Sequence, residues 1–290
     1  MAEFTDYKCK KSSDIGGLQE DVIEKLNLDF PDAYITADGM VDIAKANKES
    51  KNMQTCLVPF CHTVEAENYG GDINLGTAKI GPRCGDYVFT RKEDLLNLPA
   101  LDFNKGRISQ LICAIRILKS DGEKVTVNIN GPITILNNLM KPNKIFKIWR
   151  KEPEIMENII EKIRVQLLEY IVKVLDAGAD IIAFEDPVGA LNILGPKFFE
   201  AQGRNFSYPF VKEAIERIGD RATLHVCPKT TYQLLDLGFL ELEELELSEV
   251  MSYEEAYLAY KNKIPATGNI CIHNRNVNRT DEKLKILKLN

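Results

Sequence analysis

A short apolar stretch of the chain carries two side chains that are suited to chemistry. The stretch Ala222 to Thr231, ATLHVCPKTT, predicts a buried strand over Thr223 to Val226 that enters a turn at Pro228. Because side chains alternate along a strand, His225 and Cys227 should point to the same side at its end. An imidazole nitrogen and a thiolate sulfur are zinc ligands, and a catalytic zinc takes one further protein ligand and keeps one position open. A buried cysteine is also commonly a small hydrophobic residue, so a structural role for the pair stays open here.

Other polar side chains follow further predicted strands. In an α/β protein, ligands and catalytic groups collect at the carboxyl ends of the parallel strands. The candidates at such ends are Cys61, His62, Glu65, Asn130, Glu185, Asp186, Glu249, Asn269, Cys271 and His273. Each of the three histidines in the chain lies within two residues of a cysteine, which packing alone does not readily explain. We expect Asp186 to be a ligand-facing carboxylate, although aspartate before proline also commonly caps a turn.

The elements that must position these residues alternate between strand and helix. Strands are expected over 55–60, 125–129, 180–184, 223–226, 242–247 and 265–270, with a short strand pair over 73–80. Helices are expected over 107–119, 153–177, 209–218, 230–237 and 253–261. This alternation indicates a parallel sheet wrapped by helices. We predict an α/β fold, a single (β/α)8 TIM-type barrel domain over residues 1–290 with a helical N-terminal extension over 1–50; a doubly wound sheet is the alternative.

Composition and charge exclude several classes of function. The net charge of -6, with acidic and basic residues interspersed, argues against nucleic acid and against a membrane surface as partners. No apolar run approaches the length of a membrane span, and the opening MAEFTDYKCKKSSD lacks the apolar core of a signal peptide. Seven scattered cysteines are typical of reduced thiols, so we predict a cytoplasmic protein. Neither GxGxxG nor GxxxxGK[ST] follows a predicted strand, which weakens a nucleotide-dependent interpretation.

Four stretches, in consistent order, resemble the uroporphyrinogen decarboxylase superfamily. They are VPFCHTVEAENYGGDINLG (58 to 76), VNINGPITIL (127 to 136), GADIIAFEDPVGALNILGPKFFE (178 to 200) and LHVCPKTTYQLLDLG (224 to 238). Together they look most like the zinc-dependent methylcobamide:coenzyme M methyltransferase branch, whose fold is a (β/α)8 barrel. Ordered matches of this kind are more specific than any single motif.

The resemblance implies a zinc-dependent methyl transfer. Zinc would sit on His225 and Cys227 and on a second cysteine near the C-terminus, and it would lower the pKa of the thiol of a small acceptor. The methyl donor would be a corrinoid (methylcobalamin) carried by a corrinoid protein. Asp186 would act beside the zinc pair, Asp186, Asn130 and His62 would line the corrinoid and acceptor site, and Glu249 could approach the metal when no thiol is bound.

Two departures from the family pattern qualify this interpretation. The decarboxylase branch has an arginine-rich segment near its N-terminus, and residues 1–50 have none, which argues against tetrapyrrole decarboxylation. The methyltransferase branch has its last zinc ligand in a glycine-rich turn after a helix, whereas this chain runs from TGNICIHNRN (267 to 276) to KLKILKLN. We therefore expect a shortened C-terminal region in which Cys271 replaces the missing cysteine.

The leading hypothesis is a zinc-dependent methyltransferase that moves a methyl group from a protein-bound corrinoid to a small thiol or related acceptor. One alternative is a metal-free protein that binds a corrinoid or tetrapyrrole. Another is a decarboxylase-like lyase that uses Asp186 as its polar centre. The expected partners are a corrinoid protein and the methyl acceptor, and a homodimer is also considered.

Overall fold

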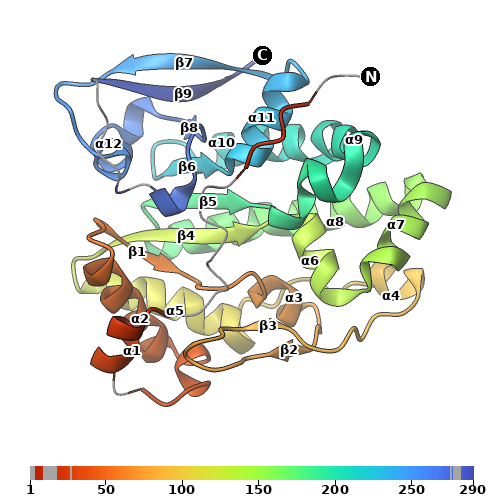
Figure 1. The fold of residues 1–290 in the computed structure, drawn as a ribbon, viewed down its shortest axis with the longest axis horizontal. Helices are drawn as coiled ribbons and strands as arrows, with labels where there is room; N and C mark the ends of the chain where they lie inside the picture. Colours follow the sequence, from red (N-terminus) through yellow and green to blue (C-terminus); the bar gives the residue numbers. More distant parts are fainter. Residues whose placement is uncertain (1–3, 9–17, 27, 275, 277–281) are drawn as a thin grey trace.

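The centre of the fold is a parallel sheet of five strands. The computed structural model describes residues 4–8, 18–26, 28–274, 276 and 282–290. The sheet has the order β1-β4-β5-β6-β8 (Figure 1), and every neighbouring pair is parallel. Its strands are β1 (Thr55–Val58), β4 (Lys124–Asn130), β5 (Ile181–Glu185), β6 (Thr223–Val226) and β8 (Ala266–Thr267). The predicted α/β class is therefore confirmed.

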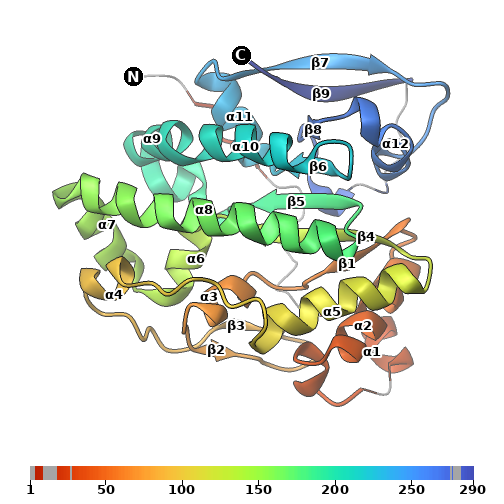
Figure 2. The same ribbon diagram turned by 180° about the vertical axis from the view of Figure 1, so that it is seen from behind.

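The outer face of this sheet is apolar and is covered by helices. Val127, Ile182 and Leu224 are register neighbours on this face, and all three belong to the main hydrophobic core. The covering helices are α5 (Gly106–Ser120), α8 (Pro153–Ala177) and α10 (Tyr208–Ile218). Figure 2 shows these helices lying over one face of the sheet. Because side chains alternate along each strand, the residues between these apolar positions point to the opposite, inner face.

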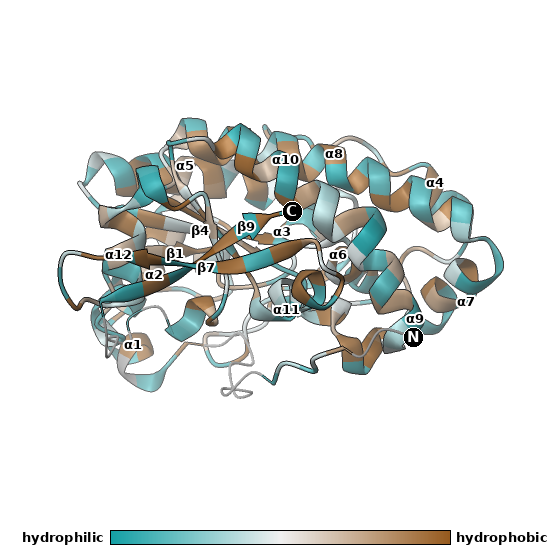
Figure 3. Cartoon of the chain, turned by 90° about the horizontal axis from the view of Figure 1, so that it is seen from above, coloured by the Kyte–Doolittle hydropathy of each residue, from teal (hydrophilic) through white to brown (hydrophobic). Residues whose placement is uncertain are grey.

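The long helix α8 begins and ends at the residues that the sequence predicts. Pro153 occupies its first turn, where a missing N–H is tolerated, and Gly178 follows its last turn with φ 112°. Figure 3 shows hydrophobic and hydrophilic residues alternating along the outer helices, as expected for helices with one face on the core and one in solvent. None of the helices in the described ranges has the length and apolar character to span a bilayer.

The predicted N-terminal helical region contains two α-helices that precede β1. They are α1 (Glu20–Lys25) and α2 (Ala37–Ser50), with the 3₁₀ turn η1 (Asp32–Tyr34) between them. Helix α2 packs against α5 and β1. The other helices are α3 (Val64–Asn68), α4 (Lys92–Leu96), α6 (Pro132–Leu139), α7 (Pro142–Lys151), α9 (Leu191–Gln202), α11 (Pro228–Asp236) and α12 (Tyr253–Ala259). Strands β2 (Ile73–Asn74) and β3 (Arg83–Cys84) pair antiparallel.

Strand β7 (Leu240–Glu246) differs from the sequence prediction, which places it in the parallel sheet. It pairs antiparallel with β9 (Lys283–Leu289) in a separate ribbon, so β6 pairs directly with β8. A strand in a parallel sheet is normally buried on both faces. The glutamates of β7 favour a solvated ribbon instead, and Lys283 and Lys288 form ion pairs with Glu244 and Glu243.

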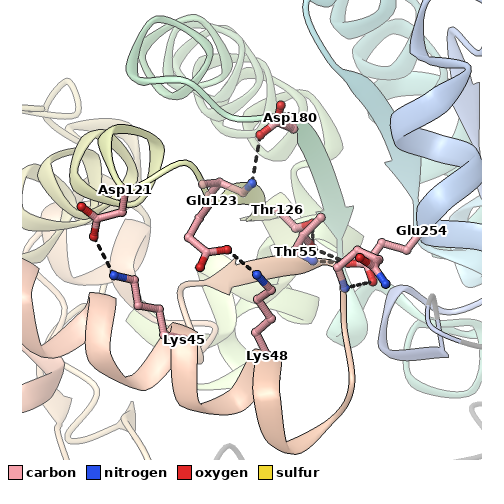
Figure 4. A network of polar contacts seen from close by, with 10 residues as sticks. Lys45, Lys48, Thr55, Asp121, Glu123, Thr126, Asp180 and Glu254 are labelled. Carbon is pink, nitrogen blue, oxygen red and sulfur yellow. Dashed lines mark hydrogen bonds and ion pairs between the residues drawn. The ribbon is translucent and has the colours of Figure 1, made fainter.

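A buried carboxylate connects α12 to the beginning of β1. Glu254 accepts hydrogen bonds from the main-chain N–H of Gln54 at 2.6 Å and of Thr55 at 2.8 Å (Figure 4). The Thr55 hydroxyl also lies 2.7 Å from the hydroxyl of Thr126 on β4. Because these contacts lie at the amino ends of the strands, they stabilise the barrel at the end opposite to its functional face.

Candidate active site

Polar residues from neighbouring strands lie at matching register positions on the inner face of the sheet. Asn128, Ala183, His225 and Thr267 are register neighbours on β4, β5, β6 and β8. Two residues further along, Asn130 pairs with Glu185, and Cys227 follows β6 with its N–H bonded to the oxygen of Phe184 at 2.9 Å. The carboxyl ends of three adjacent strands therefore bring together an amide, a carboxylate and a thiol.

His225 is fully buried and has a defined tautomer. Its Nε2 atom lies 2.8 Å from the main-chain oxygen of Ile270. A carbonyl oxygen only accepts hydrogen bonds, so Nε2 carries the hydrogen and Nδ1 has the lone pair of the neutral ring. Histidines that bind metals typically donate their other ring N–H to such an oxygen, and this arrangement therefore suits a metal ligand.

The predicted zinc ligands lie in different parts of the fold. His225 and Cys227 are at the end of β6, and Cys271 follows Ile270, whose oxygen accepts the hydrogen bond from His225. Glu249 is exposed and follows β7, outside the parallel sheet. Within the ranges that the structure describes, no three His, Cys, Asp or Glu side chains form a group that could hold a metal ion. His225 and Cys227 thus supply two suitable donor atoms, and the complete zinc set stays a prediction.

Glu65, Asn130 and His62 form a chain of hydrogen bonds beside β1 and β4. Glu65 accepts the Asn130 main-chain N–H at 2.9 Å and its Nδ2–H at 2.7 Å, and Asn130 Oδ1 lies 2.6 Å from Nδ1 of His62. Burial raises the pKa of Glu65, and the two hydrogen bonds from Asn130 oppose this rise. The predicted pair His62 and Asn130 is therefore in direct contact, and Glu65 orients it.

Asp186, which the sequence predicts to be a ligand-facing carboxylate, is buried and hydrogen-bonded to neighbouring residues. It accepts hydrogen bonds from the N–H and hydroxyl of Thr134, at 2.8 and 2.7 Å, and from Gln202 at 2.7 Å. The first turn of α6 has N–H groups without partners in the helix, and Asp186 satisfies them from the end of β5. Gly131 allows this approach, because a Cβ atom there would lie 2.5 Å from the Asp186 side chain. Burial raises the pKa of Asp186 to about 6, against the effect of its hydrogen bonds.

A cavity of about 300 Å³ lies along β1 on the inner side of the sheet. Its lining includes Cys61, His62, Asn128, Lys51 and Arg83, and no aspartate or glutamate is among the described residues that line it. Asn128 is only 4% exposed, and its Oδ1 accepts no hydrogen bond from the described part of the chain. Burial of an unsatisfied amide is costly, which indicates a site for a polar ligand.

The chain matches a known family over most of its length. Residues 17–272 match the family of uroporphyrinogen decarboxylase (URO-D). The chain belongs to the uroporphyrinogen decarboxylase family. A solved structure of a methyltransferase from Methanosarcina mazei shares its fold, with a TM-score of 0.63 at 24% identity over 74% of this chain and 64% of that chain. This likeness is consistent with the predicted TIM-type barrel, of which the described residues form five parallel strands.

Two groups of curated relatives are both named methylcobamide:CoM methyltransferases. The methylcobamide:CoM methyltransferase MtaA of Methanosarcina barkeri is 25% identical over 232 residues, which cover 79% of this chain and 67% of the relative. The methylcobamide:CoM methyltransferase MtbA of Methanosarcina acetivorans is 26% identical over 208 residues, which cover 70% and 60%. The chain therefore matches about two thirds of the length of these family members.

Sequence reasoning did not identify several residues of the site, among them Asn128 and Arg107. Asn128 lies inside β4 rather than at its end, and only the register of the sheet places it beside the cavity. Arg107 is buried on α5, where it donates to the sulfur of Cys61 at 3.5 Å and to the hydroxyl of Thr63 at 2.8 Å, and it forms an ion pair with Glu67. An arginine at an apolar helix position was the signal that could have identified it.

Proposed function

We propose that this chain transfers a methyl group from a methylated corrinoid, carried by a partner protein, to a small thiol or related acceptor. Membership of the family and the names of the relatives at about 25% identity support this proposal. The main structural support is the placement of His225 and Cys227 at the end of β6, on the polar inner face of the sheet.

His225 and Cys227 would hold a zinc ion, with Cys271 or Glu249 as the further ligand. When bound, zinc would act as a Lewis acid that favours the thiolate form of the acceptor at neutral pH. The hydrogen bond from His225 to Ile270 fixes the imidazole so that Nδ1 is the nitrogen with the lone pair. The protein would therefore prepare this ligand before the metal binds.

The cavity along β1 would hold the acceptor. Asn128 offers an unsatisfied amide oxygen inside it, and Lys51 and Arg83 place positive charge in its lining. An anion that forms when the acceptor loses its proton would be favoured there. The enclosed space would align the acceptor with the methyl group and limit the access of water, which is the main way in which such sites accelerate a displacement.

Asn130 and Asp186 would act through their neighbours. Asn130 is fully buried and orients His62, while Asp186 fixes the beginning of α6. The test of the proposed function is transfer from free methylcobalamin to 2-mercaptoethanol by the zinc-loaded protein. Thiol-dependent demethylation supports the proposal, and its absence in zinc-loaded, folded protein overturns it.

A further inference from the structure

The hydrogen bonds around Asn130 determine which nitrogen of His62 carries a hydrogen. The two oxygens of Glu65 accept from the main-chain N–H and from the Nδ2–H of Asn130. The amide oxygen of Asn130 is thereby turned toward His62, 2.6 Å from Nδ1. Since that oxygen only accepts, Nδ1 is the donor, and the lone pair of the neutral ring is on Nε2.

His62 is held in this position by its main chain as well as by its ring. The Nδ2–H of Asn138 donates to the main-chain oxygen of His62 at 2.8 Å and to the oxygen of Thr134 at 3.0 Å. Asn138 lies on α6, so a helix fixes the backbone of His62 while β4 fixes its ring. A base that is held at two points needs little reorganisation before it accepts a proton.

His62 and the unsatisfied amide of Asn128 line the same cavity. Because Nδ1 faces Asn130, Nε2 on the other edge of the ring is the nitrogen that a molecule in the cavity would meet. Asn130 and Cys227 lie on strands separated by β5, so about 10 Å separates the two sides of the site. A small acceptor in the cavity can therefore give its thiol proton to His62 before its sulfur approaches the end of β6.

We propose that His62 is the base that removes the proton from the methyl acceptor, and that Asn130 and Glu65 are its positioning residues. This inference rests on the proposed function. The bond between hydrogen and the acceptor sulfur breaks, the proton goes to Nε2 of His62, and the electron pair stays on sulfur. That electron pair then forms the bond to the methyl carbon. The bond between the methyl carbon and the donor breaks, and its electrons stay on the donor. A Lewis acid held by His225 and Cys227 would stabilise the thiolate that results.

Other charged and titratable groups also surround the cavity. They are Lys48, Lys51, Arg83, Cys61, Cys84 and His273, with Glu65 behind Asn130. The lysines and the arginine are cationic at neutral pH, and they stabilise the thiolate product rather than accept a proton. Cys61 accepts hydrogen bonds from Arg107 and Thr63, which engage its sulfur.

The first test reads the tautomer of His62 by ¹⁵N NMR of the imidazole ring and does not depend on activity. The inference predicts a hydrogen on Nδ1 and none on Nε2 in the free protein at neutral pH. It predicts that Glu65→Gln shifts the ring toward the Nε2–H tautomer, because the new amide group would favour a flip of Asn130. A parent ring with its hydrogen on Nε2 overturns the inference, whether or not methyl transfer occurs.

The second test uses His62→Asn, whose side-chain amide can keep the hydrogen bond to Asn130 but has no basic nitrogen. Transfer from methylcobalamin to 2-mercaptoethanol should fall about 100-fold in kcat at neutral pH, the usual contribution of a general base. Added imidazole and higher pH should each restore part of the rate, since either supplies thiolate without His62. A loss that neither imidazole nor pH restores shows a structural role and contradicts the proposal, as does a variant with the parent rate. If the parent itself shows no transfer, the proposed function fails, and the NMR result distinguishes that outcome from failure of the inference.

Discussion

The Nε2 atom of His225 donates a hydrogen bond to the main-chain oxygen of Ile270, 2.8 Å away. This bond connects β6 to the segment that follows β8, directly before Cys271. It fixes the tautomer of a fully buried imidazole, and it holds the backbone next to a second cysteine beside the end of β6. The sequence regions that carry three of the four predicted zinc ligands, His225, Cys227 and Cys271, are therefore joined in the fold.

Zinc content should depend on His225 and Cys227. Protein purified without added metal should contain about one zinc per chain, and the double variant His225→Ala/Cys227→Ser should contain almost none, because both protein donors at the end of β6 are lost. Elemental analysis measures this directly. Cys113→Ser is the matched control, since Cys113 is exposed on α5. Zinc retained by the double variant would show that the metal binds elsewhere.

Cys271 should contribute more to zinc binding than Glu249. Cys271 follows the residue that bonds His225, whereas Glu249 is exposed beyond a strand that has left the parallel sheet. We expect Cys271→Ser to weaken zinc binding by at least about tenfold and Glu249→Gln to leave it unchanged. Competition with a chromogenic chelator measures both affinities. The reverse order of effects would assign the third ligand to Glu249.

Asn128→Leu should stabilise the protein and impair its function. The substitution keeps a similar shape and removes an amide that has no hydrogen-bond partner for its Oδ1 among the described residues. The free energy of unfolding should rise by about 1 kcal/mol, while the KM for the acceptor thiol should rise by about tenfold. Urea unfolding and steady-state kinetics measure the two effects. A variant with lower stability and the parent KM would show that the amide is structural.

The titration of Asp186 should lower the free energy of unfolding as pH rises. Its pKa in the folded state is about 6, above the ordinary 3.8, because burial disfavours the charged form. The folded state therefore holds the proton more tightly than the unfolded state. The stability from this group is fully present below about pH 4 and is lost as pH rises through about 6, a change of about 3 kcal/mol.

Asp186→Asn removes this titration. Between pH 4 and pH 7, the parent should lose about 3 kcal/mol more of its free energy of unfolding than the variant loses. Urea unfolding at a series of pH values measures it. Asp176→Asn, at an exposed position on α8, is the control and should follow the parent. Equal pH dependence in parent and Asp186→Asn would contradict the buried, titrating carboxyl.

The local elements of the fold could be predicted from the sequence because their signals are local. The strand Thr223–Val226 and the helix Pro153–Ala177 have the predicted bounds, since an apolar run before a proline and a periodic stripe between proline and glycine define them. Helices α6, α7 and α9 were not predicted. Helices α6 and α9 begin shortly after two predicted strands end, and α7 follows α6 directly.

The pairing of distant segments could not be predicted in the same way. β7 was expected in the parallel sheet, and its actual partner β9 lies nearly 40 residues later in the chain. Asp186 was expected to face a ligand, because the sequence does not show that α6 begins beside it. The chain from Glu65 through Asn130 to His62 likewise joins residues that are 65 or more positions apart. Such contacts depend on sheet order and register, which a single sequence does not specify.

The most direct test of the central claim is the absorbance change of methylcobalamin when the zinc-loaded protein is mixed with 2-mercaptoethanol in the absence of oxygen. The account predicts demethylation of the corrinoid that needs both the thiol and the protein, with methyl thioether as the product. It also predicts that the His225→Ala/Cys227→Ser variant loses this activity while Cys113→Ser keeps it. Zinc-loaded, folded parent protein that leaves methylcobalamin unchanged across a panel of small thiols, with or without a corrinoid carrier protein, would contradict the account.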